Sequence, residues 1–451
     1  MFVNDIQDYP GYWFSFIQII LVLFLLGPVN AKTSYIKPHN HNPVHGAPNG
    51  AQYNSYQPYN TIFDVLSFGA KGDGVADDTK AFLAAWQAAC PIGSATIEIP
   101  SEFRFLVGPI TLQGPCIAGL VLQIDGTIIA PRNPSKWPKP GLLQWINVKN
   151  LHGFTIQGSG TVDGQGSEWW ILPEFQLNWL KQLAIRFYTS SNVTIRDIWI
   201  QNSPQCHLKF DNCTGVKVSN ITISSPADSP NTDGIHLQNS KWVELESSSI
   251  SCGDDCISIQ TGCSNVNIHH IRCGPGHGMS IGGLGKDGSL ACVSDIVIQN
   301  STMHNTLYGV RIKTWQGGVG SVESVIFSNI QVSNVKIPIA IDQFYCDRAI
   351  CLNKTDAVAV SNITYNQING TYTTQSAYLA CSNTIPCTNI SMNDVLLTPL
   401  TTTAWGLKKA LCWNSYGKTQ PLLFPNSTDC LEARQPPYRK APSLNRTNLT
   451  C

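Results

Sequence analysis

The segment Val193–Ile198 (Val-Thr-Ile-Arg-Asp-Ile) returns 23 residues later as Val216–Ile221 (Val-Lys-Val-Ser-Asn-Ile). In each copy, apolar β-branched residues alternate with polar ones, which is the period of a β-strand with one buried face. Further copies of this unit begin at Val243, Val266, Val325 and Val358. A β-sandwich can contain strands of this length, but a repeat of whole strand-and-turn units is typical of a solenoid.

We therefore predict an all-β fold, a single right-handed parallel β-helix, with the handedness following from strand twist. Each coil would lie ~4.8 Å above the last, so that residues one period apart become neighbours. A short capping helix is expected to end near Ala89 and to pack Phe82 and Trp86 at the N-terminal end. The β-helix domain is expected to cover residues 61–451, with a loose C-terminal tail from about 436.

The first 60 residues are expected to lie outside this domain. Residues 14–27 form an apolar run that is shorter than the ~20 residues of a spanning helix, and Ala31 offers a small residue for cleavage. Residues 1–31 therefore predict a signal peptide, with a membrane anchor as the alternative. Residues 32–60, rich in Pro, His, Asn and Gly, predict a flexible leader.

Composition favours a secreted protein. The 29 Lys and Arg residues balance 29 Asp and Glu residues, so bulk charge gives no support for nucleic-acid binding. Sixteen cysteines fit an oxidising compartment, and paired Cys-x-x-Cys zinc motifs are lacking in the sequence. We expect an extracellular monomer without a membrane partner after signal cleavage. The candidate glycosylation sites are Asn192, Asn212, Asn220, Asn300, Asn353, Asn362, Asn369, Asn389, Asn426, Asn445 and Asn448.

Four short motifs follow one another at intervals close to one coil. They are Asn-Thr-Asp-Gly-Ile-His at 231–236, Gly-Asp-Asp-Cys at 253–256, Gly-His-Gly at 276–278 and Arg-Ile-Lys at 311–313. Asp233 and Asp255 are 22 residues apart, Asp255 and His277 again 22, and His277 and Arg311 34. A solenoid that returns to one face at such intervals would gather these side chains into one patch.

Asp233, Asp254 and Asp255 lie within one predicted coil of one another. Hydrolysis of a glycosidic bond needs a protonated acid at the leaving oxygen and an ionised carboxylate on the other side of the sugar. Because close carboxylates cannot all ionise together, we expect at least one raised pKa. Neighbours on a regular strand point to opposite faces, so residues 253–255 should form a bend if both acids serve one site. A ladder of Asp and Asn turn caps is the structural alternative.

Arg311 and Lys313 are two residues apart, so both side chains project from the same strand face. A guanidinium can grip a carboxylate through two bonds, and an ammonium adds a compact charge beside it. Together they indicate that the bound sugar is itself anionic. His277, between two glycines, can orient an acid, contact the sugar, or simply occupy a turn.

With these four motifs in order, the chain resembles the plant polygalacturonases, which are pectin-cleaving, inverting glycoside hydrolases. The resemblance covers roughly residues 62–435, although the stretch 171–184 is shorter than is usual in that family. It implies hydrolysis of α-1,4-galacturonosyl linkages in homogalacturonan, an acidic polysaccharide, without a metal ion or an organic cofactor. Supporting matches are Phe68–Gly74, Val162–Gly166, Trp169–Trp170, Asn202–Pro204 and Asp342–Cys346.

The resemblance also implies the catalytic roles. Asp254 resembles the general acid, with His277 supporting it. Asp233 and Asp255 resemble the pair that holds the attacking water. The spacing of the coils alone would favour the ~5 Å carboxylate separation of a retaining enzyme, so inversion rests on the resemblance.

The implied substrate-binding residues are Asn231, Arg311, Lys313 and Tyr345. Among them, Arg311 and Lys313 correspond to a clamp for the substrate carboxylate. The implied disulfides are Cys90–Cys116, Cys256–Cys273, Cys381–Cys387 and Cys412–Cys430. We add Cys346–Cys351 as a hypothesis.

Three other functions are compatible with parts of this pattern. A pectate lyase shares the β-helix but needs Ca²⁺ and a strong base. A rhamnogalacturonan hydrolase is closer in fold but departs at the motif kept here as Gly276–Gly278. The third is an inactive protein that binds the cell wall. Endo or exo action and the tolerated degree of methyl-esterification cannot be predicted from the sequence.

Overall fold

The computed structural model describes residues 61–137, 144–172, 183–348, 350–351, 353–400, 407–433 and 451. All of them belong to one compact unit, Gln57–Cys451. The predicted signal peptide and leader lie outside the described residues, as does the C-terminal tail apart from Cys451.

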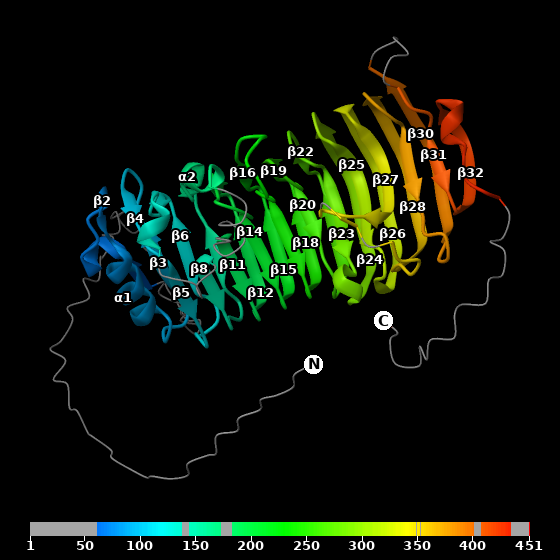
Figure 1. Ribbon diagram of the computed structural model, residues 1–451. Coiled ribbons are helices and arrows are strands. Elements are labelled where there is room, and N and C mark those ends of the chain that lie inside the picture. Colours follow the sequence, from blue (N-terminus) through cyan, green and yellow to red (C-terminus); the bar gives the residue numbers. More distant parts are fainter. Residues whose placement is uncertain are drawn as a thin grey trace, which may run out of the picture. The chain divides into compact units, whose positions relative to one another are not determined.

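The described strands form two parallel sheets that stack coil by coil along the chain (Figure 1). The 21-stranded sheet contains β1 (Thr61–Asp64), β2 (Asp73–Asp77), β3 (Ala95–Ile99), β4 (Arg104–Leu106), β6 (Val121–Ile124), β7 (Thr127–Ile129), β9 (Thr155–Gln157), β10 (Thr161–Asp163), β12 (Ser191–Arg196), β13 (Trp199–Gln201), β15 (Thr214–Ser219), β16 (Thr222–Ser224), β18 (Lys241–Glu246), β19 (Ser249–Ser251), β21 (Cys263–His269), β22 (Arg272–Cys273), β24 (Leu290–His304), β26 (Val319–Val335), β28 (Ala359–Tyr372), β30 (Cys387–Pro399) and β32 (Ser415–Phe424). The 11-stranded sheet contains β5 (Ile110–Gln113), β8 (Gln144–Lys149), β11 (Leu183–Tyr188), β14 (Leu208–Asp211), β17 (Ile235–Gln238), β20 (Ile257–Ile259), β23 (Met279–Leu284), β25 (Tyr308–Trp315), β27 (Ile337–Tyr345), β29 (Ala377–Ala380) and β31 (Leu411–Trp413). The short helices are α1 (Thr79–Ala89), α2 (Ser167–Trp170), η1 (Val65–Phe68), η2 (Pro134–Lys136), η3 (Lys286–Gly288) and η4 (Asn426–Thr428).

Equivalent positions of successive coils form columns in the core. In the column listed below, each residue is at most 1% exposed and pairs in register with the residue of the next coil, so successive coils bury their apolar faces against one another. Burying one such side chain contributes roughly 1.5–3 kcal/mol. The predicted right-handed parallel β-helix is confirmed. One column consists of Ile195, Val218, Leu245, Ile268, Ile298, Phe327, Tyr365 and Met392.

Each coil bends at a residue with left-handed backbone conformation. One such column has φ between 49° and 65° and consists of Asp197, Asn220, Ser247, His270, Asn300, Asn329, Gln367 and Asp394. Asn and Asp tolerate this conformation better than other residues with a side chain, which explains the recurring Asp-Ile and Asn-Ile pairs. Their side chains also link neighbouring coils: the Asn220 Nδ2 donates to Asp197 Oδ1 at 2.8 Å.

The predicted capping helix is α1, which packs against η1 and β3. Phe82 and Trp86 are each 5% exposed, as expected from the sequence. The helix starts at Thr79, whose backbone N–H donates a hydrogen bond to the carboxylate of Asp77 at 3.0 Å. Asp78 is buried and accepts instead from two backbone N–H groups of the preceding loop, so it ties that loop to the helix.

Six disulfides link described cysteines, and five of them were expected. The four pairs implied by the resemblance and the pair Cys346–Cys351 are confirmed. The sixth, Cys292–Cys451, was not predicted and ties the last residue of the chain to the domain. Four described cysteines are free and buried: Cys206, Cys213, Cys252 and Cys263.

Most of the candidate glycosylation sites are exposed. Asn369 is partly buried, whereas Asn445 and Asn448 lie outside the described residues. Glycosylation at any of these sites stays a prediction. The exposed sites are Asn192, Asn212, Asn220, Asn300, Asn353, Asn362, Asn389 and Asn426.

Candidate active site

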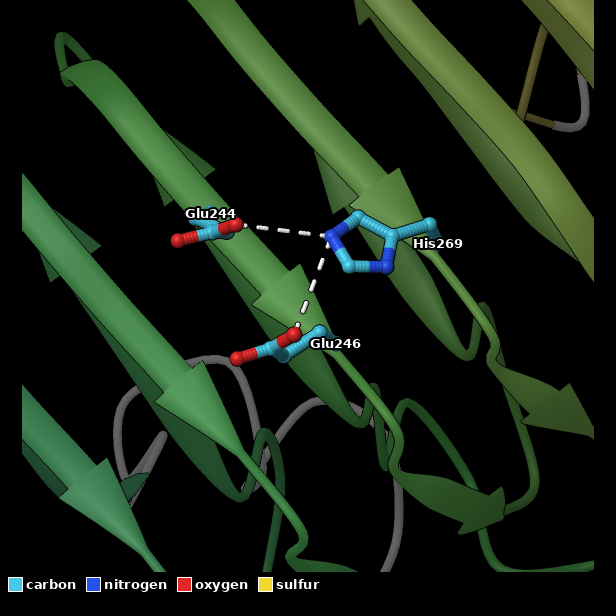
Figure 2. Close-up of side chains that lie close together, drawn as sticks. All are labelled: Glu244, Glu246 and His269. Carbon is cyan, nitrogen blue, oxygen red and sulfur yellow. Dashed lines mark hydrogen bonds and ion pairs between the residues drawn. The ribbon is translucent and has the colours of Figure 1, made fainter.

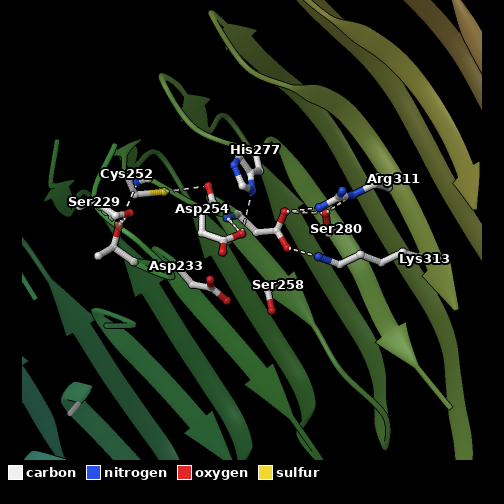
Figure 3. A network of polar contacts seen from close by, with 12 residues as sticks. Ser229, Asp233, Cys252, Asp254, Ser258, His277, Ser280, Arg311 and Lys313 are labelled. Atoms are coloured by element: carbon white, nitrogen blue, oxygen red, sulfur yellow. Dashed lines mark hydrogen bonds and ion pairs between the residues drawn. The ribbon is translucent and has the colours of Figure 1, made fainter. Parts of the chain in front are cut away.

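Four polar residues stand in register on the outer face of the 11-stranded sheet. His236, Ser258, Ser280 and Arg311 pair in turn across β17, β20, β23 and β25. The residues before and after each of them are at most 1% exposed, so these four side chains point away from the core. The three acids and His277 come from the segments that lead into β17, β20 and β23 (Figure 3).

The predicted bend between Asp254 and Asp255 is present. Residues 253 and 254 form a bend between β19 and β20, which lets both acids serve one site. A Cβ on Gly253 would lie 1.9 Å from the Ser229 carbonyl oxygen, so only glycine fits there. One oxygen of Asp254, one of Asp255 and one ring nitrogen of His277 all lie within 4.8 Å of one another.

Asp255 is a buried carboxylate held by two cations. It is 2% exposed, and its Oδ1 accepts from Arg311 Nη2 at 2.9 Å and from Ser280 Oγ at 2.7 Å. Lys313 Nζ donates to Oδ2 at 2.8 Å. Burial alone would raise the pKa of Asp255, but Lys313 and Arg311 outweigh it and lower the pKa to about 2. Asp255 is therefore ionised at mildly acidic and neutral pH.

Arg311 and Lys313 lie on one face of β25 beside the acids, as predicted. Each is only 7% exposed, and each donates to Asp255. Tyr345 lies close by, with its ring centroid 5.2 Å from Lys313 Nζ. The carboxylate between the two cations thus belongs to the protein. Their contact with a substrate carboxylate stays a proposal.

Asp233 has the opposite electrostatic environment. Burial raises its pKa well above the usual value, and the charges of Asp254 and Asp255 add to the effect. His236, whose Nδ1 lies 3.3 Å from Asp233 Oδ2, offers no positive charge near neutral pH, because burial and Lys209 lower its pKa to about 3. The raised pKa that the sequence predicts falls on Asp233, whereas the resemblance assigns the general acid to Asp254.

Asp254 is the most open of the three acids. Its side chain is 22% exposed, against 17% for Asp233 and 3% for Asp255. His277 Nδ1 lies 2.9 Å from Asp254 Oδ1, and the His277 backbone N–H donates to the Asp254 carbonyl at 2.7 Å. The imidazole therefore orients the most exposed of the three carboxylates.

Comparison with known proteins identifies the family. The model of glycosyl hydrolases family 28 matches residues 90–414. The chain belongs to glycosyl hydrolase family 28. A probable polygalacturonase of Arabidopsis thaliana is 41% identical over 371 residues, covering 81% of this chain and 83% of the relative. A polygalacturonase of Cryptomeria japonica is 42% identical over 348 residues, covering 74% and 67%. The structure of a polygalacturonase from Erwinia carotovora superimposes with a TM-score of 0.62 at 28% identity, covering 74% and 94%.

Several residues of this family 28 site were missed from the sequence. Ser258 and Ser280 belong to no motif, and His236 ends the first motif but was given no role. Only the strand register reveals that the three line up with Arg311. Thr232 was also missed; its buried hydroxyl accepts from the Gly253 backbone N–H at 2.9 Å and links two coils. Asn231, which was predicted to bind substrate, is exposed, and its role stays a prediction.

Two groups of described side chains have the donor types that bind a metal ion. One is Asp254, Asp255 and His277 in the site. The other is Glu244, Glu246 and His269 on the 21-stranded sheet (Figure 2). In each group, a neighbouring lysine already pairs with the carboxylates. Lys313 pairs with Asp255, and Lys217 lies 3.2 Å from Glu244 and 3.0 Å from Glu246. The expectation of a reaction without a metal stays a prediction.

The lowered pKa of Asp255 predicts how its contribution to stability depends on pH. A carboxylate with a depressed pKa stabilises the fold above its unfolded pKa and loses that contribution as pH falls through the folded value. Asp255→Asn should therefore lower the free energy of unfolding at pH 7, by about 3–5 kcal/mol because it leaves two buried cations unpaired. The difference in free energy of unfolding between wild type and Asp255→Asn should shrink between about pH 4 and pH 2, because the Asp255 carboxylate of wild type becomes protonated there.

Urea unfolding of both proteins at several pH values measures this difference. Asp228→Asn, at an exposed aspartate, is the control and should change little at any pH. A deficit for Asp255→Asn that stays constant down to pH 2 would show that Asp255 does not carry the charge in the folded state.

Proposed function

We propose that the chain is a secreted hydrolase that cleaves α-1,4-galacturonosyl linkages of homogalacturonan by acid–base catalysis with inversion. The observation that carries the proposal is that the three acids on one face differ in pKa and in exposure. Two cations lower the pKa of Asp255, burial raises the pKa of Asp233, and Asp254 is the most exposed of the three acids. Its relatives in family 28, which are named polygalacturonases, support the choice of substrate.

The proposed reaction balances protons between the acids. Asp254 gives its proton to the leaving glycosidic oxygen as the bond to the anomeric carbon breaks. A water attacks that carbon from the opposite side and passes a proton to Asp255. Asp255 Oδ2 has the capacity to do so, because among the described residues it accepts only from Lys313. Asp233, whose raised pKa favours the protonated form, donates a hydrogen bond that orients the water.

Secretion is supported by the six disulfides, which form and persist in oxidising compartments. Within the described part of the chain, no helix has the length and apolar character needed to cross a membrane. We expect the enzyme to act as a monomer.

An assay on polygalacturonate tests the reaction class. The purified protein should release reducing ends, without a product that absorbs in the ultraviolet, and a chelator should not reduce the rate. An absorbing product together with loss of activity to the chelator would instead identify a lyase. Binding to pectin without any cleavage would identify an inactive wall-binding protein.

A substrate with a better leaving group separates the roles of Asp254 and Asp233. On polygalacturonate, Asp254→Asn should lose roughly 10²- to 10⁴-fold in rate, because it removes the proton donor. Asp233→Asn should lose less, because the amide can still donate a hydrogen bond to the water. α-Galacturonosyl fluoride needs no proton on its leaving group, so Asp254→Asn should recover most of its activity there, whereas Asp233→Asn should not.

Unfolding midpoints equal to that of wild type would show that both variants remain folded. Recovery by Asp233→Asn alone would move the general acid to Asp233, in agreement with its raised pKa and against the role implied by the resemblance.

A further inference from the structure

Lys209 lies on the same outer face as the acids, on the side away from Arg311. It pairs in register with His236 of the next coil, and the same row continues through Ser258 and Ser280 to Arg311. Four steps of ~4.8 Å place the backbone positions of Lys209 and Arg311 ~19 Å apart. Cations therefore stand on either side of the acids along this row.

The cations on the two sides of the acids differ in whether a protein carboxylate pairs with them. Arg311 and Lys313 are both bonded to Asp255. Among the described residues, the Lys209 ammonium has no hydrogen bond and no ion pair. The acid nearest to it on its own strand, Asp211, is paired with Arg186 of the preceding coil. Lys209 is thus a cation at the edge of the site without a protein counter-ion in this part of the chain.

Lys209 is close enough to act on the catalytic residues. It contributes to the lowered pKa of His236, which contacts Asp233. Partial burial lowers the pKa of Lys209 itself, with opposing effects from Cys206 and Asp211. A partly desolvated ammonium binds an incoming anion more strongly than a fully hydrated one, because less water has to be displaced.

We propose that Lys209 binds the carboxylate of a sugar unit on the side of the cleaved bond away from Arg311 and Lys313. The polymer would then run along the row of coils from β25 towards β14, with the acids between the two cationic ends. This inference rests on the proposed function and assigns the site a point of contact with the anionic substrate outside the three acids. Lys209 would be a residue that determines preference for uronate units with a free carboxylate.

The experiment compares Lys209→Met with Lys209→Arg on two substrates, polygalacturonate and highly methyl-esterified pectin. Lys209→Met keeps most of the aliphatic stem and loses the charge, so KM on polygalacturonate should rise roughly 10-fold or more, with kcat little changed. Lys209→Arg should restore most of the affinity. On esterified pectin, which offers few carboxylates, wild type and Lys209→Met should differ little.

A matched control is Lys241→Met, at an exposed lysine on β18 of the other sheet, which should leave KM unchanged on both substrates. An equal KM for wild type and Lys209→Met on polygalacturonate would overturn the inference while leaving the proposed function intact. So would a variant that changes only the pH dependence of kcat, since Lys209 would then act on Asp233 and not on the substrate. An inactive wild-type enzyme would instead contradict the proposed function itself.

Discussion

The in-register pairing of parallel strands is the constraint on which the rest of this structure depends. Each coil offers its neighbour the same ladder of backbone groups, so a residue is stacked on its equivalents above and below it. Core columns such as the one through Ile268 and Ile298 follow from this, as do the left-handed bends at Asn220 and Asn300. The same rule places side chains from separate motifs on one outer face.

The site uses this register to give neighbouring carboxylates different charges. Asp255 lies where β23 and β25 place Ser280, Arg311 and Lys313, so it keeps its charge although it is buried. Asp233 lies one coil earlier, where no cation bonds to it among the described residues, and burial raises its pKa. Chemically identical side chains thus become a base and a proton carrier through the neighbours that the coils supply.

Much of this could be predicted from the sequence because it depends on periodicity. The repeat of Val193–Ile198 predicted the fold, and the adjacency of Asp254 and Asp255 predicted the bend. The contact of Arg311 with Asp255 could not be predicted, because a longer coil containing η3 separates β23 from β25 and hides the register.

Two other features have no recognisable pattern in the sequence. The raised pKa of Asp233 reflects burial, which is set by the packing of neighbouring coils. The disulfide Cys292–Cys451 joins residues 159 positions apart, and no periodicity links them. That Lys209 has no counter-ion among the described residues is likewise seen only in the structure, where Asp211 pairs with Arg186.

The most direct test of this account is the pH dependence of kcat/KM for Lys313→Met. Removing this cation should raise the pKa of Asp255, so that the base becomes protonated at higher pH and the acidic limb of the profile moves upward. Rates measured from about pH 2 to pH 8 for wild type, Lys313→Met and Lys313→Arg would show this, with the arginine variant expected to remain near wild type. An acidic limb that does not move, combined with a raised KM on polygalacturonate alone, would contradict the account, because Lys313 would then serve the substrate and not Asp255.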